Sequence, residues 1–341
     1  MKNLSIVFFA LKSLFITSCL SLVVSENIVA APRITVCATD CDFTSIQAAV
    51  NAPDIPVGAT ITIREPIHTE AGIVINKDIT IQGPETGESV VVQAHVDPKD
   101  AETRLFQIEE GANVTIKHLI IQHGRAPRSY PPSGGAILNY GTLLLEACII
   151  RHNTAMDGGG ILNKGSLTIN NSTISHNTAH GIHPDPGLSC GSGGAIKCET
   201  GQLIMKNSWV NENEAAEAGG GLFIACKCTA NIENTTIRGN KAYELGGGIR
   251  LRGTLTLDHA TISQNTALVG GGIHIHGTFA FSNTLIADNT HQDCHLVTEH
   301  PYKGTGAIVS NTRNLIADQS CESEYSGDTE LIPQDIGADE R

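Results

Sequence analysis

The chain has 341 residues, and its 35 acidic against 22 basic side chains give a net charge of −13 at pH 7. This excess of negative charge repels polyanions, so we expect no nucleic-acid partner. Aromatic residues make up only 4% of the chain, while glycine contributes 35 residues. That composition argues against a globular core built on large rings and favours short strands joined by tight corners.

Residues 1–31 have the features of an export signal. Lys2 and Lys12 accompany an apolar run that continues through residues 14–20 to Val24, and small residues follow at Val29-Ala30-Ala31. The apolar stretch is shorter than the ~20 residues that a spanning helix needs, so we expect no transmembrane segment after signal removal. Cys19 also lies in a sequence similar to a bacterial lipoprotein box, which leaves lipidation open as an alternative to cleavage. The sequence therefore predicts a secreted or cell-surface protein.

The ten cysteines are consistent with export, because disulfides form in oxidising compartments. Removal of the segment that contains Cys19 leaves an odd number, so at least one thiol stays unpaired within one chain. We expect the pairs Cys37–Cys41 and Cys294–Cys321. No zinc site is expected, since Cys226-x-Cys228 has no second pair at the spacing of a zinc finger.

Residues 32–58 are predicted to cap a stack of strands. Ile46, Ala49 and Val50 have helical spacing, and Thr44 or Ser45 precedes them as a helix N-cap. A short helix here would cover the otherwise open first strands. Short β-branched segments follow at residues 59–63, 72–75, 78–83, 90–93, 105–108 and 114–116, each bounded by turn-forming residues.

From Gly134 to Asn289 one unit repeats six times. The repeats open with glycine-rich turns and close with Ile-x-x-Asn or Val-x-x-Asn; the first glycines are Gly134, Gly158, Gly193, Gly219, Gly246 and Gly270, and the closing residues are Asn153, Asn177, Asn213, Asn240, Asn265 and Asn289. Most repeats span about 24 to 27 residues, enough for three short strands and three corners. A fixed period of this length indicates a solenoid, and parallel crossovers are right-handed.

The sequence therefore predicts an all-β, single-domain, right-handed parallel β-helix over residues 59–330, followed by an acidic tail at 331–341. One longer repeat places a surface loop at residues 180–190. Apolar residues recur three, eight and ten positions before the closing Asn, which places them inside the coils. The closing Asn residues, and a second column of Asn six positions earlier, are predicted to form stacked amide ladders at corners. We expect a monomer.

Several segments carry a resemblance to known families. Residues 43–50, 68–75 and 78–83 look like the opening coils of secreted bacterial β-helix proteins of the pectate-lyase-like superfold. The repeats also resemble those of chlamydial polymorphic outer-membrane proteins. Residues 293–294 and 314–321 resemble the last coils of β-helix proteins that begin with a Cys-Ser-Leu-Arg-Glu-Ala-Ile segment. The resemblance implies the fold and export, and it leaves activity open because members include lyases, hydrolases, esterases and adhesins.

Glu233 and Asp258 are the best candidates for a catalytic pair. Both stand seven positions before the closing Asn, which places them on adjacent coils. Enzymes that cleave uronate polymers need clustered carboxylates, or Ca²⁺ beside a basic residue, and inverting glycosidases hold two carboxyls roughly 6.5 to 9.5 Å apart. No cofactor is otherwise expected. A surface pair with no role in catalysis is the alternative.

A second set of side chains is predicted to form a basic face: Lys227, Arg250, Arg252, His274 and His276. Counted back from the closing Asn, Arg250 and His274 follow Cys198 and Ala225 in one column. A flat cationic sheet suits the carboxylate or sulfate groups of an anionic polysaccharide or another cell-surface ligand. The alternative is that these residues only increase solubility.

A third column holds four potential ligands of a transition metal: His123, His152, His176 and Glu212, each directly before a closing Asn or in the equivalent position one coil earlier. Packing of imidazoles at a corner explains the same pattern. From these observations we expect a non-catalytic β-helix protein that displays a carbohydrate- or cell-surface-binding face. A polysaccharide lyase or glycoside hydrolase is the alternative.

Overall fold

The structure is a computed structural model that describes residues 33–86, 89–127, 132–181, 191–298 and 306–321. The predicted export signal with Cys19, the acidic tail at 331–341 and residues 182–190 of the predicted loop lie outside the described residues. Within the described ranges, no helix is both long and apolar enough to span a membrane.

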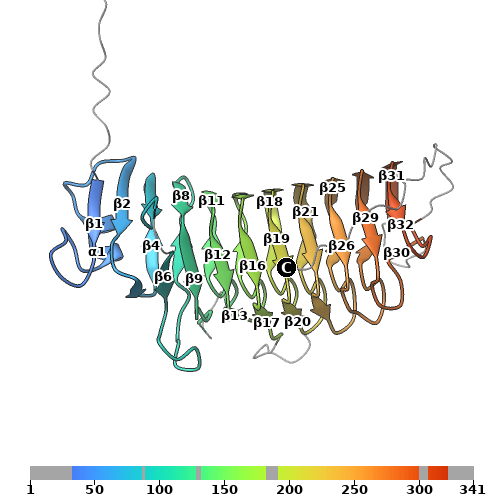
Figure 1. The fold of residues 1–341 in the computed structure, drawn as a ribbon, viewed down its shortest axis with the longest axis horizontal. Helices are drawn as coiled ribbons and strands as arrows, with labels where there is room; N and C mark the ends of the chain where they lie inside the picture. Colours follow the sequence, from blue (N-terminus) through green and yellow to red (C-terminus); the bar gives the residue numbers. More distant parts are fainter. Residues whose placement is uncertain (1–32, 87–88, 128–131, 182–190, 299–305, 322–341) are drawn as a thin grey trace, which may run out of the picture. The chain divides into compact units, whose positions relative to one another are not determined.

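The described strands form the three faces of a right-handed parallel β-helix, and successive coils lie side by side from β1 to β32 (Figure 1). A 10-stranded sheet takes one strand from each coil. It consists of β3 (Ile67–Thr69), β6 (Val90–Gln93), β9 (Leu119–Gln122), β12 (Ile149–Arg151), β16 (Thr173–Ser175), β19 (Trp209–Asn211), β22 (Thr236–Arg238), β26 (Thr261–Ser263), β29 (Leu285–Ala287) and β32 (Leu315–Ile316).

An 18-stranded sheet holds most of the remaining strands. Its members are β1 (Arg33–Val36), β2 (Ala59–Ile63), β4 (Ile73–Ile75), β5 (Ile79–Gln82), β7 (Phe106–Ile108), β8 (Asn113–Lys117), β10 (Ile137–Asn139), β11 (Thr142–Glu146), β14 (Ile161–Asn163), β15 (Ser166–Asn170), β18 (Ile196–Lys206), β21 (Leu222–Glu233), β24 (Ile249–Leu251), β25 (Thr254–Asp258), β27 (Ile273–Ile275), β28 (Thr278–Ser282), β30 (Cys294–Leu296) and β31 (Ala307–Thr312). A 4-stranded sheet contains β13 (Thr154–Ala155), β17 (Thr178–Ala179), β20 (Glu214–Ala215) and β23 (Lys241–Ala242).

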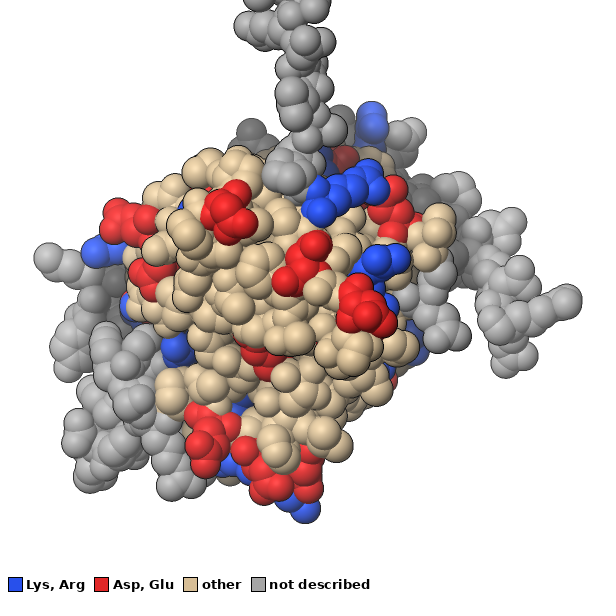
Figure 2. Space-filling view, turned by 90° about the vertical axis from the view of Figure 1, so that its left-hand side faces the viewer, with Lys and Arg blue, Asp and Glu red and all other residues tan. Residues whose placement is uncertain are grey.

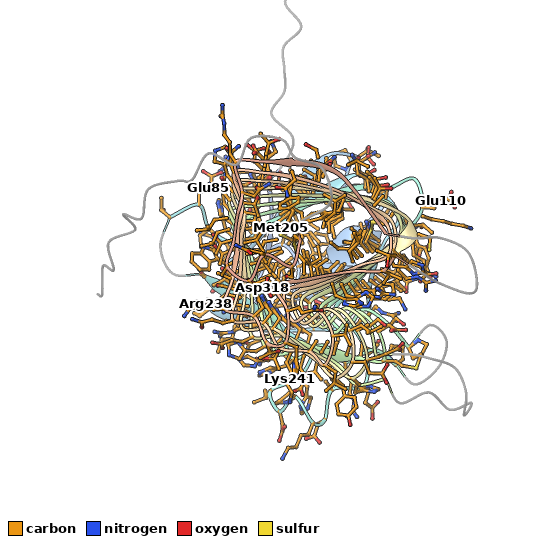
Figure 3. The ribbon with its side chains drawn as sticks, turned by 90° about the vertical axis from the view of Figure 1, so that its right-hand side faces the viewer. Glu85, Glu110, Met205, Arg238, Lys241 and Asp318 are labelled. Atoms are coloured by element: carbon orange, nitrogen blue, oxygen red, sulfur yellow. A yellow bond between two sulfur atoms is a disulfide. The ribbon has the colours of Figure 1, made fainter. Side chains whose placement is uncertain are left out.

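The predicted inward columns form the core. Leu143, Leu167 and Leu203 pair in register on β11, β15 and β18, and all three are buried. Viewed along the stack of coils, Met205 lies inside, whereas Arg238 and Lys241 point outward (Figure 3). Each fully buried aliphatic side chain contributes roughly 1.5 to 3 kcal/mol. A single coil buries these side chains only when its neighbours cover it, so stacking stabilises the fold.

The closing Asn residues form a buried amide ladder, as predicted. The Asn153 Nδ2 donates to Asn177 Oδ1 at 2.9 Å, and the same contact continues through Asn213, Asn240, Asn265 and Asn289. Each of these Oδ1 atoms also accepts the backbone N–H of the Asn one coil earlier. The ladder therefore satisfies the polar groups of a corner that lies inside the protein.

The second Asn column lies at an outer corner with left-handed backbone. Asn171, Asn207, Asn234 and Asn283 have φ between 46° and 50°, a conformation that Asn tolerates better than most residues. Only part of this column forms an amide ladder, through the contact from Asn234 Nδ2 to Asn207 Oδ1 at 2.7 Å. Backbone conformation, more than stacking, explains why Asn recurs here.

The cap segment contains the predicted helix, α1 (Ile46–Asn51), and also the first sheet strand, β1. Ser45 is the N-cap, and its Oγ accepts the Ala48 N–H at 3.0 Å. Ile46, Ala49 and Val50 are buried against the first coils. Figure 2 shows this end of the described stack with acidic and basic side chains interspersed, so neither sign forms a continuous patch there.

A charged cluster fixes the start of α1. The Glu70 carboxylate accepts the Ile46 and Gln47 N–H groups at 2.7 and 2.9 Å and contacts His68 Nε2 at 2.7 Å. The Nδ1 of His68 contacts Glu65 at 2.5 Å. Burial by itself would lower the pKa of His68, but its two carboxylate partners outweigh burial and raise it. Burial alone would raise the pKa of Glu70, yet the His68 and N–H contacts lower it.

The cap should therefore be most stable at mildly acidic pH. The contribution of His68 is present below its ordinary pKa of 6.5 and is lost as pH rises through its higher folded pKa. The contribution of Glu70 is present above its ordinary pKa of 4.5 and is lost as pH falls through its lower folded pKa. Amide exchange at Ile46 and Gln47 measures this effect. The difference in exchange between wild type and His68→Gln should be largest between pH 4.5 and 6.5. A difference that is constant with pH would contradict the assignment.

Three disulfides lie within the described residues. Cys37 bonds to Cys41 and Cys294 bonds to Cys321, with Cα–Cα distances of 5.5 and 5.1 Å. The third, Cys198–Cys228, joins neighbouring coils and was not expected. Of the remaining described cysteines, Cys148 is a buried thiol and Cys226 an exposed one. These bonds suggest an oxidising, extracellular environment.

Candidate binding cleft

A cleft of about 410 Å³ lies against the outer face of the 18-stranded sheet. Its floor is a column of outward side chains on β18, β21 and β24, where Lys197, Phe223 and Arg250 pair in register. One wall comes from the segments that precede the glycine-rich turns. The cleft is lined by Ser192, Lys197, Glu199, Glu217, Ala218, Phe223, Ala225, Leu245, Arg250 and Arg252.

The register corrects one predicted column. Counting back from the closing Asn placed Cys198 and Ala225 beside Arg250, but Phe223 is its actual neighbour and Lys197 the next. The error arises because β18 and β21 contain extra residues, with a register shift between Cys198 and Thr200. Counting forward from the glycine-rich turns gives the correct column, since the floor residue follows the first apolar residue after each turn.

Arg250 is the central cation of the floor. Its side chain is buried, its Nη1 contacts His274 Nδ1, and His274 lies next to His295 with ring centroids 4.9 Å apart. Burial, followed by the nearby Arg252, lowers the pKa of Arg250 to about 10, so the guanidinium stays charged at neutral pH. Burial and then Arg250 lower the pKa of His274 to about 3. His274 is therefore neutral, and its Nδ1 accepts a hydrogen bond from Arg250.

Lys197 and Phe223 form the other half of the floor. The Lys197 Nζ lies 5.4 Å from the centroid of the Phe223 ring and 3.1 Å from Asp157 Oδ2. Asp157 also accepts the N–H groups of Gly191 and Ser192 through Oδ1 at 3.0 and 2.9 Å. Both oxygens of Asp157 are thus committed to holding the wall and the floor together, and only 9% of Phe223 stays exposed beside Lys197.

The positive charge of the cleft comes from its two arginines, and the Glu217 carboxylate, which also lines the cleft, partly offsets it by acting on Arg250. Glu199 pairs with Lys164 at 3.4 Å, as Asp157 does with Lys197. Among the described residues, neither Arg250 nor Arg252 forms an ion pair with a carboxylate. Arg252 is exposed, whereas Arg250 is held in place from beneath by His274. This arrangement suits a ligand that carries carboxylate or sulfate groups.

The predicted basic face is therefore brought together only in part. Arg250 and Arg252 line the cleft, and His274 supports Arg250 from the floor. Lys227 is exposed and lies among the extra residues of β21. Neither Lys227 nor His276 lines the cleft. Lys197 and Phe223 were missed because the counting error moved them out of the column.

Glu233 and Asp258 are paired in register on adjacent coils, but they are engaged elsewhere. Lys206 Nζ lies 2.7 Å from Glu233 Oε2, and Asp258 Oδ1 accepts from Ser282 Oγ at 2.7 Å. Hydrogen bonds from Ser282, then Asn283 and His259, lower the pKa of Asp258 to about 2. That pKa is opposite to the requirement for a general acid, and neither carboxylate lines the cleft.

The column of predicted metal ligands is stacked at an outer corner. Ring centroids of His123 and His152 are 6.5 Å apart, those of His152 and His176 are 5.0 Å apart, and His176 Nε2 lies 2.5 Å from Glu212 Oε2. All four have left-handed backbone, with φ between 53° and 60°. Burial, followed by His176, Arg151 and His123, lowers the pKa of His152. Nowhere in the described ranges do three or more His, Cys, Asp or Glu converge to hold a metal ion.

A second cavity, of about 640 Å³, lies beside the segment at residues 99–102 and Arg125. The Arg125 Nη1 donates to the carbonyl of Lys99 at 3.3 Å, so this arginine is used to hold the segment. Both acidic and basic residues line it, and Arg125 is the one arginine among the described residues of its lining.

Comparison with known proteins agrees with the fold. The family described as "Right handed beta helix region" matches residues 99–290. A search of curated proteins finds no match. Among solved structures, pectate lyase Pel9A is 14% identical with a TM-score of 0.50, covering 79% of this chain and 68% of that chain. The pectin methylesterase of Aspergillus niger is 13% identical with a TM-score of 0.47, covering 74% of this chain and 84% of that chain.

At these identities the structural likeness concerns the fold alone. The family match covers more than half of the chain, and it spans the coils that carry the cleft. The chain therefore belongs to the right-handed β-helix family.

Proposed function

We propose that this protein binds acidic polysaccharide in the cleft without cleaving it. The observation that carries this proposal is that Arg250 and Arg252 both line the cleft and, among the described residues, neither forms an ion pair with a carboxylate. Phe223 lies beside Arg250 in the floor. A uronate or sulfated sugar presents an anionic group, and the two guanidinium groups offer charge-assisted hydrogen bonds to it. The floor column runs along successive coils, so an extended chain is a better fit than a single sugar.

Catalysis is the less favoured alternative. The carboxylates that would perform it, Glu233 and Asp258, lie outside the cleft and are engaged by other side chains. The carboxylate in contact with the floor, Asp157, has both oxygens occupied. Asp157 is therefore not available as a ligand for the Ca²⁺ that a lyase mechanism would use.

We also propose that the protein acts outside the cell, either secreted or held at the cell surface. The three disulfides support this location. The export signal at residues 1–31 and lipidation at Cys19 remain predictions from the sequence. Mass spectrometry of the protein recovered from its native host would distinguish cleavage from lipidation.

Retention on immobilised glycans tests the binding proposal. We expect the wild-type protein to be retained on polygalacturonate at low salt and released by added salt, and to pass through an uncharged dextran matrix. Arg250→Ala and Arg252→Ala should each elute earlier, because each removes a charge-assisted contact. Lys227→Ala is the matched control, since it removes an exposed cation outside the cleft.

Two results would contradict the proposal. Unchanged retention of both arginine variants would exclude the cleft. New reducing ends or unsaturated products from polygalacturonate, with or without Ca²⁺, would establish the enzyme alternative, and loss of those products in Glu233→Gln and Asp258→Asn would assign it to the predicted pair.

A further inference from the structure

The outer face of the 10-stranded sheet carries a second continuous column that the cleft does not use. Each strand presents its first or second residue outward, and these residues are paired in register from coil to coil. The column reads Ile67, Val91, Ile120, Ile149, Thr173, Trp209, Thr236, Thr261, Leu285 and Leu315. We call this column the Trp209 face. It contains no charged residue.

Trp209 stands out within this face. It is the only tryptophan of the chain, and 51% of its surface is exposed. The register places Thr173 on one side of it and Thr236 on the other. An indole combines an apolar ring with an N–H donor, and tryptophan is enriched at contact surfaces for that reason.

The surroundings of Trp209 are polar but mostly uncharged. A second outward column lies two residues further along the same strands. On the coils next to Trp209 it carries Ser175, Asn211, Arg238 and Ser263, of which only Arg238 is a cation. The Arg238 Nε donates to Gln264 Oε1 at 3.0 Å, and the side chain points outward from the stack (Figure 3). Hydroxyl and amide groups therefore frame the indole on both sides.

We propose that the Trp209 face binds a neutral, hydroxyl-rich polysaccharide chain, separately from the acidic ligand of the cleft. The indole offers an apolar plane for the C–H face of a pyranose ring, and the flanking threonines and Asn211 offer hydrogen-bond partners for its hydroxyls. The column itself carries no charged residue, and the neighbouring Arg238 donates to Gln264, so the indole and the hydroxyls are the main partners that this face offers to a sugar. The column repeats at each coil, ~4.8 Å apart, which favours an extended chain lying along the coils.

The two sites are on different sheets and use different chemistry. The cleft depends on the arginines of the 18-stranded sheet, and the Trp209 face depends on an indole and hydroxyls of the 10-stranded sheet. Binding in the cleft should weaken with added salt, whereas binding on the Trp209 face should not. Together the two faces would allow one molecule to bridge an acidic and a neutral glycan.

The single tryptophan makes the test specific, since intrinsic fluorescence excited above the tyrosine band reports on this face alone. We expect titration with cellohexaose, a neutral β-linked glucan, to shift the emission to shorter wavelength, saturably and equally at low and high salt. Calorimetry should show binding at least about tenfold weaker for Trp209→Ala and intermediate for Trp209→Phe. Tyr243→Ala is the control, because Tyr243 is an exposed aromatic (67%) outside this face.

Three outcomes would overturn the proposal. The absence of an emission shift with cellohexaose or chitohexaose at millimolar concentration would exclude a neutral glycan as the ligand of this face. A shift only with oligogalacturonate, lost at high salt, would show that the face reports on an acidic ligand. Self-association that depends on Trp209 in sedimentation experiments would make a second copy the occupant. Arg250→Ala separates the two proposals, since it should weaken retention on polygalacturonate and leave the cellohexaose shift intact.

Discussion

Asn240→Ala is expected to lower the free energy of unfolding by roughly 3 to 5 kcal/mol, because it opens the middle of the buried amide ladder. The Asn240 Oδ1 accepts the backbone N–H and the side-chain Nδ2 of Asn213 at 3.0 and 2.9 Å. Its Nδ2 donates to the Val210 carbonyl and to Asn265 Oδ1 at 2.9 and 3.0 Å. Alanine leaves all four groups without this partner in a place that water does not reach, and each such loss costs ~1 kcal/mol or more.

Asn234→Ala is the matched control from the same coil. Asn234 is exposed, has φ of 46° and makes one side-chain contact to Asn207. Its replacement should cost about 1 kcal/mol, mostly from the loss of a residue that tolerates left-handed backbone. Denaturant unfolding followed by circular dichroism measures both variants. Equal losses for the two substitutions would show that the buried ladder has no special role.

Gly247→Ala is expected to destabilise the fold by about 3 kcal/mol or more, since the added methyl group meets only backbone. A Cβ at this position would lie 2.5 Å from the Gly271 carbonyl oxygen and 2.5 Å from the Thr266 nitrogen. Backbone atoms of a neighbouring coil move only if the coils separate. We therefore expect a lower denaturation midpoint together with faster proteolysis.

Gly58→Ala provides the comparison for that substitution. Nothing lies within 4 Å of a Cβ at Gly58, and its φ of 80° makes alanine unfavourable by only about 1 kcal/mol. A midpoint for Gly247→Ala no lower than that of Gly58→Ala would mean that the coils adapt to the methyl group. The glycine-rich turns would then be explained by chain flexibility instead of close approach.

The repeat made the interior of the fold predictable. Residues that recur at one position of a period lie above one another in a solenoid, so the Leu143 and Leu145 columns and the Asn153 ladder follow from spacing alone. The same logic predicted α1, because its three buried residues have helical spacing within the segment before the first coil. Each of these features depends on distances along the chain within one regular unit.

The cleft was only partly predictable because it depends on register across an irregular unit. The extra residues in β18 and β21 shift Lys197 by one position and Phe223 by two relative to the closing Asn. The Cys198–Cys228 bond was missed for the same reason, since partners on neighbouring coils are recognised only once the coils are aligned. The role of His274 was also hidden, because its contact with Arg250 depends on side-chain placement in the structure.

The Trp209 face was not predicted because its distinguishing feature is the exposure of the Trp209 side chain, which the sequence alone does not show. Val210, the neighbour of Trp209 in sequence, is fully buried, and a residue pattern alone does not show how much of an outward indole stays open. The column also extends to coils that precede the regular repeats, at Ile67 and Val91. Only the pairing of strands shows that these residues share one face with Trp209.

The most direct test of the account is the affinity for a defined oligogalacturonate, measured by calorimetry at low and high salt in wild type, Arg250→Ala and Lys227→Ala. We predict that the wild-type affinity falls with added salt and that the ligand is recovered intact. Arg250→Ala should bind about tenfold more weakly and with a smaller salt dependence. Lys227→Ala should behave as wild type. Equal affinity and salt dependence in wild type and Arg250→Ala, or a shortened ligand, would contradict it.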